Sequence, residues 1–129
     1  MSDIVVTVPK TFTHPCAPGK GLSAWIAEGD AAGDVDDEWG PDDYCFSVAG
    51  GRPNINPGER VYIVCEGRIR GYAPLVELQE LGPAYWGLIR SGGAVAVTIP
   101  ERVQGFRGWR YRWWKREDEV PFPDWRTAK

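Results

Sequence analysis

The sequence predicts an α+β protein, a small mixed β-barrel with one or two short helices. Six or more short segments rich in β-branched and aromatic residues are separated by glycine and proline turns. Residues 59–78 have the alternating pattern of a β-hairpin around a tight turn at Glu66 and Gly67. Gly71 and Pro74 in the return strand indicate a bulge or a sheet edge, a common way for a sheet to bend into a barrel.

The first half of the chain predicts a strand, a helix and an acidic loop. Residues 4–9 are β-branched and end at a proline, so they predict a buried opening strand. Residues 22–29 predict a short helix with Trp25 on its apolar face. Residues 30–43 hold seven acids together with Trp39, and this composition is typical of an exposed loop.

The remaining strands are expected on both sides of the hairpin and near the C-terminus. Residues 44–49 alternate large and small side chains and predict a second strand. The predicted later strands are 85–91, 94–100 and a last region within 103–114. With 129 residues and no internal repeat, we expect a single domain over residues 1–129.

Charge is distributed unevenly along the chain. Residues 1–50 carry nine acids and two lysines, a net charge of −7, whereas residues 51–129 carry a net charge of +4. Residues 102–116 contain six basic residues and no acid. A bipolar charge distribution of this kind predicts a basic face that attracts an anionic partner.

Arginines and aromatic residues are interleaved in GFRGWRYRWWKR, residues 105–116. Guanidinium groups pair with phosphates and aromatic rings stack on bases, so this composition suits single-stranded or flipped-out nucleic acid. The candidates in this segment are Arg107, Trp109, Arg110, Tyr111, Arg112, Trp113 and Trp114. In a strand, however, Trp109, Tyr111 and Trp113 would lie on one face and the arginines on the other. A solvated arginine face over an aromatic core is therefore the alternative.

Three further residues are candidates for the same interface. Arg68 and Arg70 flank Ile69 on the hairpin return, and they would extend a basic groove if that strand neighbours the last one. A solvent-exposed hairpin end is the alternative for this pair. Trp39 lies in the acidic loop, where an aromatic has few ways to be core, so it is a candidate stacking lid.

The hairpin segment PGERVYIVCEGRIRGYAPLVEL, residues 57–78, resembles the central hairpin of the PUA-like superfamily, which includes the ASCH and EVE domains. Gly58 and Glu59 match the loop that begins the strand there, and Gly71 matches a glycine before the apolar end of the return strand. The resemblance implies a PUA-like pseudobarrel whose cleft binds RNA or DNA. In EVE-like members that ligand is often a modified base held by aromatic residues.

The same resemblance implies an enzymatic alternative. Some ASCH-like proteins carry a lysine, a hydroxyl residue three positions later and a strand glutamate, with which they hydrolyse an acylated base. Lys20, Ser23 and Glu77 are similar to that set, with Ser23 standing where the family has threonine. The serine would attack the amide carbon, the lysine would take its proton and the glutamate would orient or relay it.

Several classes of function are disfavoured by the composition. The three cysteines show no CxxC spacing and His14 is the only histidine, so we expect no metal and no cofactor. The N-terminus lacks the pattern of a secretory signal, and no segment has the length of a membrane span. We therefore expect a cytoplasmic protein whose partner is a nucleic acid or nucleoside. A protein-interaction module that dimerises through its aromatic strand is a third alternative.

Overall fold

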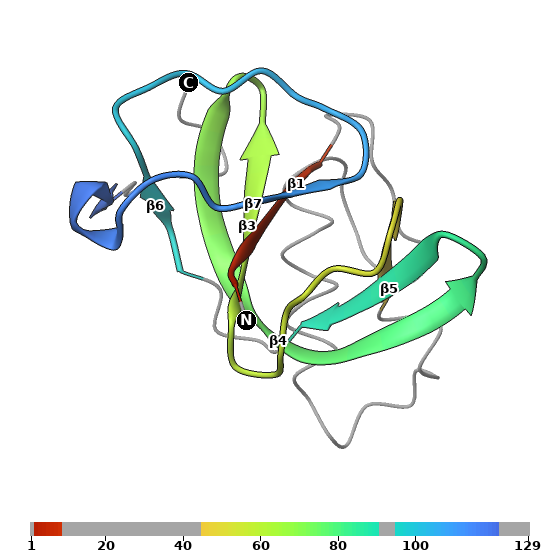
Figure 1. Ribbon diagram of the computed structural model, residues 1–129. Helices are drawn as coiled ribbons and strands as arrows, with labels where there is room; N and C mark the ends of the chain where they lie inside the picture. The colour runs from red at the N-terminus through yellow and green to blue at the C-terminus, as the bar shows by residue number, and fades with distance from the viewer. Residues whose placement is uncertain (1, 9–44, 91–94, 122–129) are drawn as a thin grey trace, which may run out of the picture.

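The computed structural model describes residues 2–8, 45–90 and 95–121 (Figure 1). Its strands are β1 (Ile4–Thr7), β2 (Cys45–Ala49), β3 (Arg60–Cys65), β4 (Arg68–Gly82), β5 (Tyr85–Arg90), β6 (Val97–Thr98), β7 (Trp109–Tyr111) and β8 (Val120–Pro121). The 3-10 helix η2 (Arg116–Asp118) is the one helix within these residues. The described part is therefore mostly β-structure, and the helix and acidic loop predicted for residues 22–43 lie outside it. None of its helices is long or apolar enough to cross a membrane.

Six strands form one mixed sheet in the order β2-β5-β4-β3-β1-β7. Strand β1 pairs with β3 in parallel and with β7 antiparallel. A second, two-stranded sheet pairs β6 with β8. Within the described residues the large sheet ends at β2 on one side and at β7 on the other, so it is not closed. A small β-rich fold is thus observed, and the predicted barrel is not confirmed.

The predicted β-hairpin is confirmed as β3 and β4. Glu66 and Gly67 have positive φ angles of 52° and 82°, as a two-residue hairpin turn of type I′ requires. The pairing shifts register between Ile63 and Val64, opposite Gly71, so the predicted bulge is also present. From Leu75 onward β4 pairs with β5, and Figure 1 shows the β4–β5 hairpin extending to the right of β3.

The core lies on both faces of the central strands because their side chains alternate between two clusters. On one face, Val5 of β1 and Tyr62 of β3 pack in the cluster that contains Trp114. On the other face, Ile4 and Ile63 pack in a cluster with residues of β5. All these strand residues are fully buried, and each large apolar side chain stabilises the fold by about 1.5–3 kcal/mol.

The last strands are shorter than the sequence predicts. Strand β7 covers three residues of the predicted region 103–114, and it begins directly after Gly108. Gly108 has a φ of +72°, and a Cβ there would lie 2.8 Å from the carbonyl oxygen of Ala49. Before Gly108, the backbone amide of Phe106 donates to the Thr7 hydroxyl at 3.0 Å rather than to a carbonyl of a neighbouring strand. Residues 101–108 therefore form a loop that leads into β7.

Candidate nucleic-acid interface

One side of β7 holds the loop between β2 and β3. The rings of Trp109 and Tyr111 meet edge to face at 4.8 Å, as strand alternation predicts for these two residues. The indole of Trp109 donates to the Gly51 carbonyl at 2.9 Å, and the Tyr111 hydroxyl accepts from the Asn54 amide at 3.2 Å. This half of the predicted aromatic site thus makes contacts within the fold.

Arg112, a candidate for phosphate contact, is bound to Asp3 instead. Its Nε donates to Oδ2 of Asp3 at 3.0 Å, and Arg116 donates to the same oxygen at 3.0 Å. The amide of Arg60 donates to the other oxygen at 2.8 Å. The Asp3 side chain is 2% exposed, so these donors satisfy a buried carboxylate. The prediction that Arg112 shares a solvent-facing strip with Arg110 is therefore wrong.

The Asp3 carboxyl has a pKa below its usual value as the result of opposing effects. Burial by itself raises this pKa, because it disfavours the charged form. The hydrogen bonds from Arg60 and Arg116, with the positive charges of Arg116 and Arg112, outweigh burial and lower it. Asp3 is therefore ionised in the folded protein at neutral pH.

Trp114 is also part of the fold rather than of an open surface. It is buried, and its indole donates to Oε2 of Glu119 at 2.9 Å. The Tyr62 hydroxyl donates to the same oxygen at 2.6 Å, and Arg60 donates to the second oxygen at 3.2 Å. Burial, together with the hydrogen bond to Glu119, raises the pKa of Tyr62 far above its ordinary value. This network fastens η2 and the start of β8 to the sheet.

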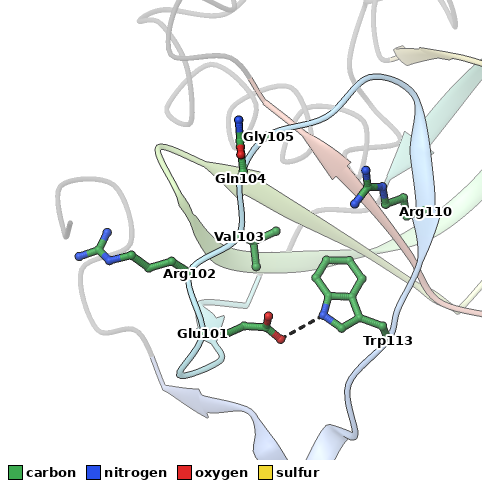
Figure 2. Close-up of a pocket in the computed structure, with 7 residues that line it drawn as sticks. All are labelled: Glu101, Arg102, Val103, Gln104, Gly105, Arg110 and Trp113. Atoms are coloured by element: carbon green, nitrogen blue, oxygen red, sulfur yellow. Dashed lines mark hydrogen bonds between the residues drawn. The ribbon is translucent and has the colours of Figure 1, made fainter.

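Arg110 and Trp113 meet in a groove of about 420 Å³. The groove is lined by Glu101, Arg102, Val103, Gln104, Gly105, Arg110 and Trp113 (Figure 2). Strand alternation would place Arg110 and Trp113 on opposite faces, but β7 ends at Tyr111, before Trp113. The condition for placing Trp113 on the face opposite Arg110, a strand that runs through residue 113, is therefore not met, and a guanidinium and an indole share one opening.

The indole of Trp113 is presented at the surface by its neighbours. The residue is 44% exposed, and its ring meets that of Trp114 edge to face at 5.0 Å. Its Nε1 donates to Oε1 of Glu101 at 3.0 Å, as the dashed line in Figure 2 shows. These contacts hold the ring while leaving a large part of it accessible to a ligand.

The basic residues around the groove differ in orientation. The Arg110 guanidinium lies over the Phe106 ring, 4.3 Å from its centre, and the residue remains exposed. Figure 2 shows Arg110 and Arg102 on opposite sides of the groove, with the end of Arg102 pointing away from it. Arg107 is exposed on the preceding loop and does not line the groove.

Arg68 and Arg70 do not extend this groove. Strands β3 and β1 separate β4 from β7, so the condition for a shared basic surface is not met. Arg70 is 2% exposed, its Nε donates to the Cys65 carbonyl at 2.9 Å, and its Nη2 lies 3.9 Å from Glu66. Arg68 is half-buried and donates to the Thr98 hydroxyl at 3.3 Å. The prediction that this pair offers an open cationic surface is wrong for Arg70.

Other predicted site residues are not brought together by the described part of the chain. Trp39, Lys20 and Ser23 lie outside the described residues, so the stacking lid and the hydrolase remain predictions. Glu77 is exposed on β4, opposite Ile89 of β5. Within the described ranges, no three histidine, cysteine, aspartate or glutamate residues are grouped to hold a metal ion.

Two acids of this region were not among the predicted site residues. Glu101 immediately precedes the acid-free segment 102–116, and that position is its only signal in the sequence. Asp3 lies more than a hundred positions from Arg112, and nothing local predicts their contact.

Comparisons with protein-family models, curated proteins and solved structures find no match to this chain.

Proposed function

We propose that the protein binds single-stranded nucleic acid, RNA or an extruded or modified base, in the groove between Arg110 and Trp113. The observation that supports this most is that an exposed indole and an exposed guanidinium face the same opening. A base would stack on Trp113, because every base has a π face and stacking needs no particular sequence. Arg110 would pair with a phosphate of the same strand.

The charge around the groove supports the same function. The chain carries a net charge of −3, yet three of the six basic residues in 102–116, Arg102, Arg107 and Arg110, lie at the groove or on the loop that lines it. Arg102 lies at the rim and Arg107 on the adjoining loop, where both would meet the backbone of a bound strand. Phosphate contacts of this kind supply most of the affinity of sequence-independent binding, and they make it depend on salt.

The PUA-like resemblance is part of this proposal. The β3–β4 hairpin and its bulge opposite Gly71 support it, because they lie in the segment that carries the resemblance. In that family the cleft holds a nucleic acid or a modified base. We also propose that the sheet closes into a pseudobarrel, as the resemblance implies.

The test is the affinity of the protein for short labelled RNA and DNA strands, measured by fluorescence anisotropy over a range of salt concentrations. Trp113→Ala should weaken binding about ten-fold, because stacking on one aromatic contributes about 1–3 kcal/mol per base. Arg110→Ala should weaken binding of all sequences alike and reduce the slope of log affinity against log salt by about one.

A matched control is Arg52→Ala, which removes the same charge from the other face of the sheet. Arg52 is exposed, and its guanidinium lies 5.2 Å from the centre of the Trp86 ring. Trp86 belongs to the core cluster on one face of the sheet, whereas the groove residue Val103 belongs to the cluster on the other face. It should change affinity much less than Arg110→Ala. Equal losses in the two variants would mean that only net charge matters, and they would overturn the proposed groove. Absence of binding by the wild type at low salt would overturn the function itself.

A further inference from the structure

We propose that the groove selects guanine, and that the carboxylate of Glu101 makes the selection. This inference rests on the proposed function, since it names the base that the Trp113 groove accepts. Among the described residues that line the groove, Glu101 is the one acid. A negative charge there opposes the binding of a polyanion, so it lowers affinity for phosphate. A carboxylate at this position can instead accept hydrogen bonds from a base and so help to recognise it.

The position of the carboxylate relative to the indole supports this role. Oε1 of Glu101 accepts the Nε1–H bond of Trp113 at 3.0 Å, which places the carboxylate beside the edge of the ring. A base stacked on the indole would bring its own edge to the same side. Figure 2 shows the second carboxylate oxygen turned away from the indole. An ionised carboxylate has about four lone-pair sites, so the bond to Trp113 leaves capacity for donors from a base.

The hydrogen-bonding pattern of the four bases then determines the preference. A carboxylate at neutral pH only accepts hydrogen bonds. Guanine presents two adjacent donors, N1–H and the N2 amino group, on its Watson–Crick edge. Adenine and cytosine present one amino group beside an acceptor nitrogen, and uracil presents one N–H between two carbonyl oxygens. Guanine is therefore the base that pairs with Glu101 through two parallel bonds, and uracil is repelled most.

The experiment compares uridine octamers that carry one guanosine, inosine, adenosine or cytidine at a central position. Wild type should bind the guanosine strand about ten-fold more tightly than the all-uridine strand, in line with discrimination by other bidentate base contacts. Inosine keeps N1–H but lacks the N2 amino group, so its strand should lie between these two. The readout is the ratio of dissociation constants at one fixed salt concentration.

Glu101→Gln separates base selection from support of the indole. The glutamine carbonyl still accepts the bond from Trp113, but its amide group offers a donor where guanine needs an acceptor. The preference for guanosine should fall to less than about three-fold, while affinity for the all-uridine strand rises because a negative charge is lost. Glu117→Gln is the matched control, since Glu117 is an exposed acid on η2 outside the groove. It should leave the preference unchanged.

The outcomes distinguish this inference from the function on which it rests. If wild type shows no preference for guanosine while Arg110→Ala still weakens binding, guanine selection is overturned and the nucleic-acid groove stands. If Glu101→Gln weakens all strands equally, Glu101 only supports Trp113 and its selective role is overturned. If wild type binds none of the strands, both proposals fall.

Discussion

Trp113 and Trp114 are adjacent in the chain and have opposite surroundings. Trp114 is 8% exposed, donates to Glu119 and meets the Tyr62 ring edge to face at 5.1 Å. Trp113 is 44% exposed and lines the groove. Two adjacent residues of one type therefore serve the core and a candidate binding surface.

The arginines before them differ in the same way. Arg112 donates to the buried Asp3, whereas Arg110 lies exposed over Phe106. We call Arg112, Trp114 and Arg116 the anchored set, and Arg110 and Trp113 the groove set. Arg112 and Arg116 are bound to Asp3 at the other end of the chain, and Trp114 is bound to Glu119 five residues later. For the two arginines, the comparison teaches that a partner distant in sequence, Asp3, and not residue type, decides which side chain remains open to a ligand.

The largest expected difference between the sets is in the two tryptophans. Trp114→Ala should lower the free energy of unfolding by about 4 kcal/mol, because it empties a buried aromatic site and removes one of the three donors to Glu119. Trp113→Ala should lower it by less than about 1 kcal/mol. Urea denaturation followed by circular dichroism measures both values. Similar losses in the two variants would contradict the division into sets.

Asp3→Asn tests the partner of the anchored arginines. We expect a loss of about 2–3 kcal/mol in the free energy of unfolding, because the buried asparagine would place an amide donor against the donors of Arg60, Arg112 or Arg116. Arg110→Ala, in the groove set, should change the same quantity by no more than about 0.5 kcal/mol. Equilibrium denaturation at pH 7 compares them. A stable Asp3→Asn variant would show that these ion pairs are not needed to anchor the segment.

Tyr62→Phe removes one donor from Glu119 while keeping the buried ring. We expect a loss of about 2 kcal/mol, the usual contribution of a hydrogen bond to a charged group. The raised pKa of Tyr62 adds an alkaline effect: the unfolded protein releases this proton more readily, so stability should decline as the pH rises above about 10. Thermal melts from pH 8 to 11 measure the decline. An equally steep decline in the Tyr62→Phe variant would mean that other groups cause the loss of stability at alkaline pH.

The smallest expected effect is acid sensitivity from Asp3. Its pKa is lowered in the folded protein, so the stabilisation is present above the ordinary value and is lost as the pH falls through the folded value. The effect is modest because burial opposes the hydrogen bonds that lower the pKa. Urea denaturation between pH 7 and pH 2.5 should show less acid sensitivity in Asp3→Asn than in wild type. Identical profiles would mean that Asp3 does not titrate with folding.

Local patterns predicted the central strands well and the C-terminal segment poorly. The β3–β4 hairpin follows from alternation and from a turn that Glu66 and Gly67 can form, and both are properties of neighbouring residues. The groove depends on where β7 ends, and that end follows from contacts with other strands. The basic segment 102–116 contains the groove residues Arg102 and Arg110, but the contacts of Arg112 with Asp3 and of Trp114 with Tyr62 could not be predicted from neighbouring residues.

The amino-acid sequence alone predicted the β-rich character and the hairpin with its bulge, and it shows the concentration of arginine and tryptophan near the C-terminus. These features depend on periodicity, turn chemistry and composition, which act over a few residues. Contacts between distant parts of the chain decided which of these arginines and tryptophans are buried. Asp3 reaches Arg112 only after β1 and β7 have paired, and Tyr62 of β3 reaches Trp114 and Glu119 only when β3 has packed against them, because burial of a carboxylate requires donors that the tertiary structure brings to it.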